Sequence, residues 1–273
     1  MFWTRFISSV VLAVIALVTL ILGGPLLAGI TFLISVIGYL ELCKAVGIHT
    51  KEKKLNGLEA VGILGIAAYY AAIYFADGGL LSLIAVVGVF MGSMCVYVVT
   101  FPKYASERIM ANFFCFVYAP VMLSFIYLTR HLHYGEYIVW LILISAWGCD
   151  TCAYLVGICI GKKKIFPVLS PKKSLEGCIG GVVGAGLLGA LYSFLVVEKA
   201  VADQKVTLII VFICMAGAVM SQVGDLAASA IKRNHDIKDY GKLIPGHGGI
   251  MDRFDSVIVT APMIYFLTAL LIK

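Results

Sequence analysis

The sequence predicts an all-α, polytopic helical membrane protein with about nine transmembrane helices. Hydrophobic residues make up 62% of the 273 residues and charged residues only 13%, which is roughly half the charged fraction of a soluble domain. The mean hydropathy is +1.02. Apolar runs of the length that a bilayer requires, about 20 residues, recur along the whole chain.

Nine apolar runs are expected to form the transmembrane helices. The first run continues through Gly23, Gly24 and Pro25 into the second without a polar cleavage region, so we expect a retained span and not a secretory signal. Pro120 lies inside the fifth run, which membrane helices tolerate. The runs occupy residues 6–22, 26–43, 57–75, 79–100, 109–128, 136–158, 178–197, 206–231 and 254–272.

The distribution of positive charge predicts the orientation. Of the 21 Lys and Arg residues, 17 lie in the N-terminal segment and the even-numbered connections. The positive-inside rule then places the N-terminus in the cytoplasm and the C-terminus outside, as an odd number of spans requires. We expect a multi-pass protein of the cell membrane, most simply a bacterial plasma membrane, with no nucleic-acid partner.

The polar residues divide the chain into two predicted regions. Residues 1–135, with five spans, are expected to be a membrane scaffold, because their acids lie near span ends or in loops. Residues 136–273, with four spans and two basic cytoplasmic loops, are expected to be catalytic. The scaffold acids are Glu41, Glu52, Glu59, Asp77 and Glu107.

Two acids lie inside apolar runs of the second region. Asp150 falls in the sixth run and Asp225 in the eighth, both in the predicted cytoplasmic half. A carboxylate at this depth costs about 2.5–3.5 kcal/mol on insertion scales and usually faces a functional cavity. The alternative is a pair of buried acids that form hydrogen bonds to neighbouring helices and have a structural role only.

The eight cysteines also lie mostly in apolar runs, and Cys149-x-x-Cys152 is better explained by helix packing than by a metal site.

A polar stripe surrounds Asp225. Gln222, Asp225, Ser229, Lys232 and Arg233 have the spacing of one helix face. This stripe runs from the membrane interior to the cytoplasm, whereas a merely solvated face would not begin inside an apolar run.

The loop after the stripe predicts a phosphate site. It contains Lys238, Asp239, Gly248 and Gly249, and glycines let backbone amides approach an anion closely. His247 lies between glycines, where phosphate contact or a turn hydrogen bond is favoured over metal ligation.

Asp252, Arg253 and Asp255 follow at the start of the last span. The alternative interpretation of Asp255 is that it only caps the helix. Asp225 and Asp252 enter this loop from opposite ends, and carboxylates with phosphate oxygens are ligands that Mg²⁺ prefers.

The other basic loop follows the Asp150 run. It includes Lys162, Lys163, Lys164, Lys172, Lys173 and Ser174. These cations are suited to clamping nucleotide or lipid phosphates, with simple attraction to anionic headgroups as the alternative.

Both loops resemble one family. The segment from Ser229 to Asp255, SAIKRNHDIKDYGKLIPGHGGIMDRFD, is similar throughout to the signature of the phosphatidate cytidylyltransferase family. A second region, formed by Asp150-x-x-Ala153-Tyr154-x-x-Gly157, Gly161-Lys162 and Ser170-Pro171-x-Lys173-Ser174-x-x-Gly177, also resembles it. Cys152 replaces a usual Gly there, and Ser174 stands where Thr is common. The first five spans match only in hydropathy.

The resemblance implies a Mg²⁺-dependent transfer of the cytidylyl group of CTP to phosphatidic acid, in phospholipid biosynthesis at the cytoplasmic face. It implies Asp225 and Asp252 as metal ligands and a homodimer. Asp150 would support the site electrostatically or through a second cation such as K⁺. Phosphate contacts would come from Lys232, Arg233, Lys238 and Arg253, with Ser229, Asp239, His247, Gly248, Gly249, Asp255, Lys172, Lys173 and Ser174 as further substrate-binding residues.

Two other functions stay open at this point. A CTP-dependent polyprenol or phytol kinase would transfer the γ-phosphate instead of the cytidylyl group. An ion-coupled transporter would need acids across the whole bilayer, whereas those within spans here cluster in one half.

Overall fold

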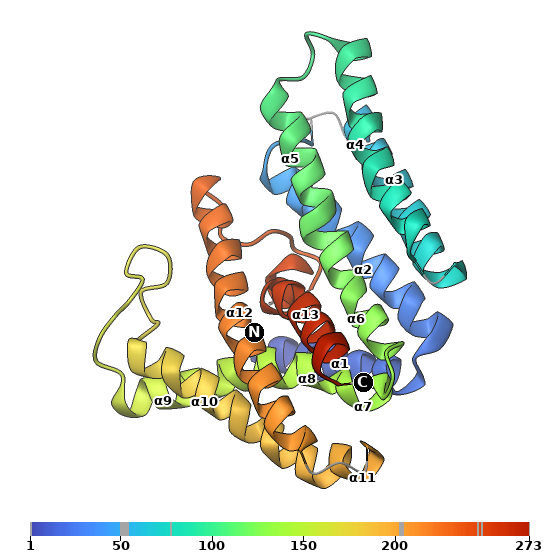
Figure 1. The fold of residues 1–273 in the computed structure, drawn as a ribbon. Helices are drawn as coiled ribbons and strands as arrows, with labels where there is room; N and C mark the ends of the chain where they lie inside the picture. The colour runs from blue at the N-terminus through green and yellow to red at the C-terminus, as the bar shows by residue number, and fades with distance from the viewer. Residues whose placement is uncertain are drawn as a thin grey trace. The chain divides into compact units, whose positions relative to one another are not determined.

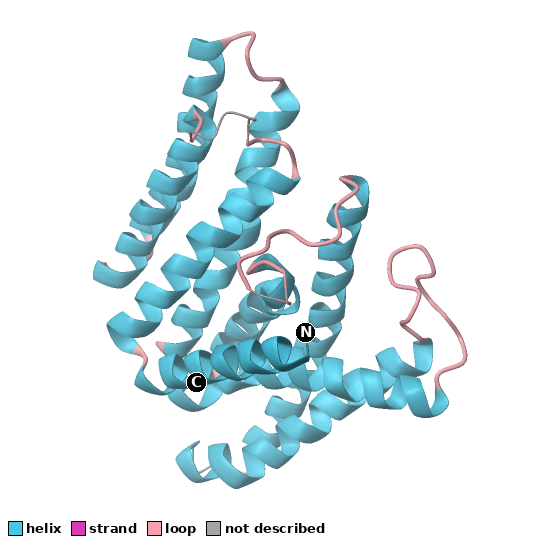
Figure 2. Ribbon diagram, turned by 180° about the vertical axis from the view of Figure 1, so that it is seen from behind, coloured by secondary structure: helices cyan, strands magenta, loops and turns pink. Residues whose placement is uncertain are grey.

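The computed structural model describes residues 2–49, 55–76, 78–201, 205–244, 246 and 248–272, with side chains described for residue 8 and from residue 10 onward in these ranges. Over these residues the regular secondary structure is helical (Figure 1; Figure 2). Within them, eight helical segments are long and apolar enough to cross a membrane. Helix α1 (Phe2–Leu22) adds a shorter apolar stretch, Val10–Leu22. The predicted fold class, a polytopic helical membrane protein, is confirmed.

The remaining helices follow the predicted apolar runs within a few residues. The helices are α2 (Gly24–Ala45), α3 (Gly57–Phe75), α4 (Leu80–Thr100), α5 (Ser106–Phe116), α6 (Met122–Arg130), α7 (Gly135–Ile138), α8 (Trp140–Leu143), α9 (Cys149–Ile160), α10 (Leu175–Tyr192), α11 (Glu198–Val201), α12 (Val206–Asn234) and α13 (Met251–Leu271). Helices α5, α10 and α13 each begin three residues before the predicted start, and the earlier start of α13 places Asp252 in its first turn.

Three of the spans contain a wider, π-helical turn. In the span Ser106–Arg130 this turn, Val117–Val121, includes Pro120, which has no N–H to donate to the preceding turn. A second turn, Ile144–Gly148, directly precedes α9, the helix that carries Asp150. A third, Ser193–Val197, follows α10. The proline therefore changes the winding of its span without ending it.

The chain forms two compact units, which we call unit 1 and unit 2. Unit 1 contains residues 1–124 and 234–253, and unit 2 contains residues 125–233 and 254–273. The loop after α12 and the first residues of α13 thus belong to the same unit as the first five helices. The predicted division at residue 135 separates a scaffold from a catalytic region by function, and it stays a prediction.

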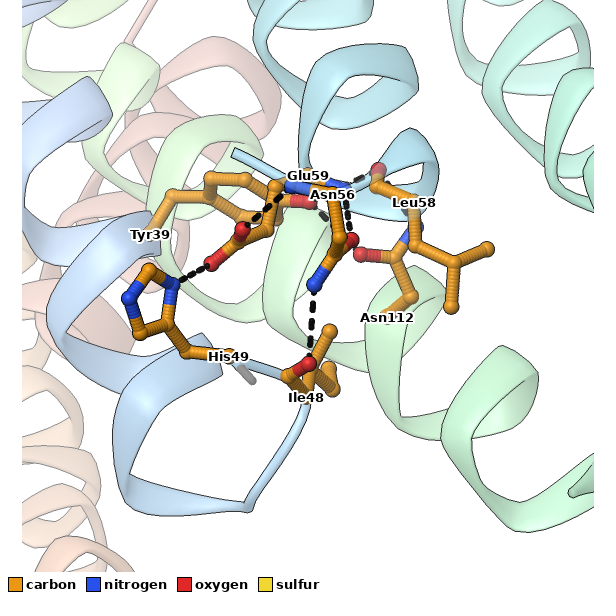
Figure 3. A network of polar contacts seen from close by, with 7 residues as sticks. All are labelled: Tyr39, Ile48, His49, Asn56, Leu58, Glu59 and Asn112. Carbon is orange, nitrogen blue, oxygen red and sulfur yellow. Dashed lines mark hydrogen bonds and ion pairs between the residues drawn. The ribbon is translucent and has the colours of Figure 1, made fainter. Parts of the chain in front are cut away.

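A buried polar network holds the helices of unit 1 together. The Tyr39 hydroxyl of α2 donates to Asn112 Oδ1 of α5 at 2.6 Å. Asn112 Nδ2 donates to Ser93 Oγ of α4 at 3.1 Å and to the Leu58 carbonyl of α3 at 3.3 Å. Part of this network is drawn in Figure 3. Because Asn112 is fully buried, its side chain satisfies polar groups from three other helices that have no access to water.

A capping box at the start of α3 continues the network. The Asn56 side chain accepts from the Glu59 N–H, and the Glu59 carboxylate accepts from the Asn56 N–H. The same carboxylate binds His49 Nδ1 at 2.7 Å, and Asn56 Nδ2 donates to the Ile48 carbonyl (Figure 3). The C-terminal end of α2 and the start of α3 are therefore tied together, which fixes the position of α2.

We expect Asn112→Leu to destabilise the protein by about 1–3 kcal/mol, because it leaves the Tyr39 hydroxyl and the Ser93 hydroxyl without this partner. Thermal unfolding in detergent measures the effect as a lower midpoint. Ser82→Ala, which removes an exposed hydroxyl bonded to the Gly79 carbonyl, is the control. Equal midpoints for the two variants would show that the network does not stabilise unit 1.

Unit 2 is packed through small residues. On α10, a Cβ atom at Gly184 would lie 2.5 Å from Cys152 Sγ of α9, and one at Gly189 would lie 2.6 Å from Cys214 Sγ of α12. A Cβ atom at Gly224 of α12 would lie 2.6 Å from the Asp255 carbonyl of α13. The glycines therefore let these helices approach closely, as small residues do in membrane helix pairs.

Candidate active site

An ion pair in unit 2 joins the basic loop to the polar stripe. Lys173 Nζ lies 2.5 Å from Asp225 Oδ2, and the two side chains are 21% and 31% exposed. Asp225 lies in the C-terminal half of α12, inside a candidate membrane span. A partly buried carboxylate is costly unless it has a partner, and Lys173 supplies that partner here.

The base of the loop between α9 and α10 is closed by hydrogen bonds. The Glu176 carboxylate accepts from the Lys162 N–H at 3.0 Å and from the Lys163 N–H at 3.2 Å. Ser174 caps α10 by accepting from the Gly177 N–H at 3.2 Å. These bonds anchor the segment on both sides of Lys173 and so limit where its ammonium group can reach.

Other cations of this loop point away from the interior. Lys162, Lys163, Lys164 and Lys172 are exposed, and Lys164 Nζ donates to the Lys172 carbonyl at 3.0 Å. Within the loop, Lys173 is thus the lysine that contacts an intramembrane acid, while the others remain accessible to phosphates or lipid headgroups.

Two further acids surround the Lys173–Asp225 pair. Asp150 on α9 interacts electrostatically with both members of the pair. Asp255 on α13 interacts with Asp225 and with Lys232, and its Oδ1 accepts from the Ser256 N–H at 2.8 Å. Asp255 lies in the second turn of α13, past the usual capping position. Unit 2 therefore brings Asp150, Asp225 and Asp255 into one electrostatic environment.

The predicted polar stripe lies on one continuous helix. Helix α12, labelled in Figure 1, spans Val206–Asn234 and so includes Gln222, Asp225, Ser229, Lys232 and Arg233. Ser229 and Lys232 are half-buried, and Arg233 is exposed. Gln222 Nε2 donates to the Cys178 carbonyl of α10 at 2.9 Å. The stripe thus leads from a packed helix contact to an exposed cationic end.

In unit 1, Asp252 organises the glycine loop. Its Oδ2 accepts from the Tyr240 N–H at 2.8 Å and from the Gly249 N–H at 3.0 Å, and the residue is only 8% exposed. The loop turns through Gly246 and Gly248, both with positive φ, and is closed by the Ile244 N–H donating to the Gly248 carbonyl at 2.9 Å. Asp252 therefore holds the two sides of the loop together.

Several predicted residues lie around this loop. Lys238, Asp239 and Arg253 are exposed. His247 is outside the described residues. Asp225 belongs to unit 2 and Asp252 to unit 1, and their pairing as metal ligands stays a prediction.

Sequence reasoning missed Glu41, which it assigned to the scaffold. Glu41 Oε2 accepts from the Met251 N–H, the first residue of α13, at 3.0 Å. The two residues are 210 positions apart in the chain, so no local pattern indicates this contact. The only signal in the sequence is an acid near the end of an apolar run.

The predicted metal ligands, Asp225 and Asp252, are both carboxylates, and their binding of Mg²⁺ stays a prediction. Among the described residues, no three His, Cys, Asp or Glu side chains converge closely enough to hold one ion. Mg²⁺ takes one or two carboxylates and completes its shell with waters and substrate phosphates. The hard carboxylate oxygens of Asp225 and Asp252 match that chemistry.

Comparisons with known proteins show the family of this chain. The model of the "Cytidylyltransferase family" matches residues 3–271. A relative from Staphylococcus saprophyticus, named phosphatidate cytidylyltransferase, is 32% identical over 265 residues, covering 96% of this chain and 97% of its own. A Bacillus subtilis protein of the same name is 42% identical over 137 residues, about half of each chain (50% and 49%). One from Thermotoga maritima is 35% identical over 172 residues, 62% of this chain and 63% of its own.

These matches confirm the resemblance first indicated by the signature, and they favour neither a polyprenol kinase nor a transporter. The family match covers nearly the whole chain, including the first five spans, where the sequence alone offered hydropathy only. The chain belongs to the cytidylyltransferase family.

Proposed function

We propose that this protein transfers the cytidylyl group of CTP to phosphatidic acid, producing CDP-diacylglycerol and pyrophosphate. A phosphate oxygen of phosphatidic acid attacks the α-phosphorus of CTP. The bond from that phosphorus to the bridging oxygen of the β-phosphate breaks, and pyrophosphate leaves with the electron pair. The phosphatidate oxygen is already ionised near neutral pH, so the reaction requires positioning and charge neutralisation more than a strong base.

The observation that carries the proposal is the Lys173–Asp225 pair, together with an apolar groove whose lining includes residues next to Asp225 on α12. The groove has a volume of about 440 Å³ and lies between α10 and α12. Gln222 and Leu226, which flank Asp225 on α12, line it, and so does Phe166 of the basic loop. A substrate with a phosphate headgroup and acyl chains matches this combination of hydrocarbon surface and charge.

The charged residues have complementary roles in this proposal. Lys173 would neutralise a phosphate of the lipid or of CTP, and the exposed Arg233 and Lys238 would hold the nucleotide phosphates. Asp225 and Asp252 would hold Mg²⁺, which supplies neutralisation of the phosphate charge. Asp150 and Asp255 would tune the field around Asp225. We also propose that the site faces the cytoplasm, where CTP is available, and that the protein forms a homodimer.

A direct assay tests the proposal with the purified protein in vesicles. We expect pyrophosphate release from CTP to require both Mg²⁺ and phosphatidic acid. Diacylglycerol and a polyprenol, supplied in place of phosphatidic acid, should give no release. Pyrophosphate release without phosphatidic acid, or lipid phosphorylation accompanied by CDP release, would contradict the proposed reaction.

The groove makes a separate prediction about the lipid. We expect Val219→Trp, which fills the groove with a larger side chain, to raise the KM for long-chain phosphatidic acid by about 5–10-fold, since each CH₂ group excluded from apolar contact costs about 0.8 kcal/mol. The KM for CTP should stay within about twofold, because the nucleotide does not enter hydrocarbon surface.

Leu208→Trp provides the matched control, because Leu208 is exposed on the same helix but does not line the groove. Steady-state kinetics in mixed micelles, with the lipid varied as a surface fraction, measures both constants. The same increase in both variants would contradict the assignment of the groove to the acyl chain.

A further inference from the structure

Glu41 connects the second helix of unit 1 to the loop that carries the cytidylyltransferase signature. Its Oε2 accepts from the Met251 N–H at 3.0 Å, and the Ile250 N–H adds a second backbone interaction with this carboxylate. The first N–H groups of a helix have no partner within the helix. Glu41 therefore satisfies the N-terminus of α13 from a different helix.

The loop is shaped around this carboxylate. A Cβ atom at Gly241 would lie 2.7 Å from Glu41 Cδ, and a Cβ atom at Gly249 would lie 2.5 Å from the same atom. Real Cβ atoms do not approach other atoms so closely. The two sides of the loop thus converge on Glu41 at positions where only a glycine leaves room for it.

Asp252 holds the same two sides of the loop through different atoms. It accepts from the N–H groups of Tyr240 and Gly249, whereas Glu41 contacts Gly241, Gly249 and the start of α13. The loop backbone is therefore clamped between two carboxylates. One belongs to the signature itself and the other comes from the N-terminal scaffold.

The scaffold gives Glu41 a fixed position. Tyr39 and Leu42, its neighbours on α2, are fully buried. Tyr39 is part of the network that joins α2 to α3, α4 and α5, and Figure 3 draws its members Tyr39, Leu58 and Asn112. A carboxylate on a helix restrained in this way is preorganised, so little entropy is lost when it binds the loop.

We propose that Glu41 is a positioning residue for the reaction. It sets the conformation of the described loop residues 238–244 and 248–249, and thereby the placement of Asp252 and of the loop amides relative to the nucleotide phosphates. The inference rests on the proposed function for the identity of the reaction, but the contact itself can be tested without turnover. Through Glu41, the N-terminal spans would help to shape the active site as well as support the fold.

Hydrogen exchange tests the contact independently of activity. We expect Glu41→Ala, in the full-length protein in nanodiscs, to increase amide exchange in peptides covering residues 240–251 by about tenfold or more, while peptides around Tyr39 and Asn112 keep their protection. Glu107→Ala is the matched control, because Glu107 is an exposed glutamate in the same unit. Unchanged exchange of the loop in Glu41→Ala would overturn the proposal.

Kinetics then separate positioning from general stability. We expect Glu41→Ala to lower kcat by about 10–100-fold, since a displacement of about 1 Å in a positioning group costs up to 10²-fold. The KM for phosphatidic acid should stay within about twofold, because Glu41 does not line the groove. Glu41→Gln, which keeps one acceptor oxygen, should recover part of the lost kcat. A Glu41→Ala protein with lowered thermal stability but normal kcat would show that the residue is structural only.

A double variant tests the packing of the glycine against the carboxylate. Gly249→Ala introduces a methyl group into the space of Glu41 and should lower kcat by itself. Glu41→Ala frees that space, so the double variant should be no worse than Glu41→Ala alone, a non-additive result expected for residues in contact. Losses that multiply in the double variant would contradict the proposed arrangement.

Discussion

We expect Asp225→Asn to lower kcat by at least about 10³-fold while leaving a folded, membrane-inserted protein. The substitution keeps the size of the side chain but removes the negative charge that pairs with Lys173 Nζ at 2.5 Å and that would hold Mg²⁺. Loss of a single preorganised electrostatic contact in an active site costs about 10²–10³ in kcat, and here one change removes both a charge pair and a proposed metal ligand.

The stability of the variant should change much less than its activity. The Asp225 side chain is 31% exposed, so water screens this end of the pair, whereas the Lys173 Nζ atom is buried. Asp236→Asn is the matched control, since Asp236 is exposed and its positive φ of 52° is tolerated by Asn. Kinetics and thermal unfolding of both variants give the comparison.

The double variant Asp225→Asn with Lys173→Met distinguishes a catalytic pair from a structural one. If the pair only balanced charge within the membrane, removing both members would restore function, because no unpaired charge is left. We expect the double variant to remain inactive, because both groups are assigned to substrate or metal. Recovery of near-normal turnover would contradict their place in the active site.

Substitution of Asp252 should lower kcat by a similar factor. Its side chain contributes hydrogen bonds to the loop and a negative charge, and two substitutions separate these contributions. Its Oδ2 accepts two loop N–H groups, and an Asn carbonyl oxygen at the same position can accept both of them. Asp252→Asn should therefore keep the loop conformation and lose the charge. We expect kcat to fall by at least about 10³-fold, with amide exchange at Tyr240 and Gly249 close to that of the native protein.

Asp252→Ala removes both contributions. It should lower kcat at least as far as Asp252→Asn and should also increase amide exchange in the loop. Near-normal turnover of Asp252→Asn, together with an inactive Asp252→Ala, would show that Asp252 is an anchor of the loop and not a metal ligand.

The helices were predictable because hydropathy is a local property. Residues 57–75 and 79–100 were placed within one residue of the observed α3 and α4. The start of α13 was predicted three residues late, because Met251, Asp252 and Arg253 include two charges and interrupt the apolar pattern. These residues form the first turn of α13, where the negative charge of Asp252 interacts favourably with the helix dipole.

The contacts of the site were predictable only in part. The spacing from Gln222 to Arg233 correctly indicated one helix face, because helical periodicity is fixed by the backbone. The pairing of Lys173 with Asp225 and the contact of Glu41 with Met251 join segments far apart in the chain. Such contacts depend on how helices pack, which no local pattern specifies. The role of His247 stays a prediction.

The fate of labelled CTP tests the central claim most directly. The purified protein is incubated in vesicles with Mg²⁺, phosphatidic acid and CTP labelled either at the α-phosphorus or at the γ-phosphorus. Cytidylyl transfer predicts that the α-label enters the lipid fraction and that the γ-label appears in pyrophosphate. A lipid labelled only from the γ-phosphorus would identify a CTP-dependent lipid kinase and contradict the proposed reaction.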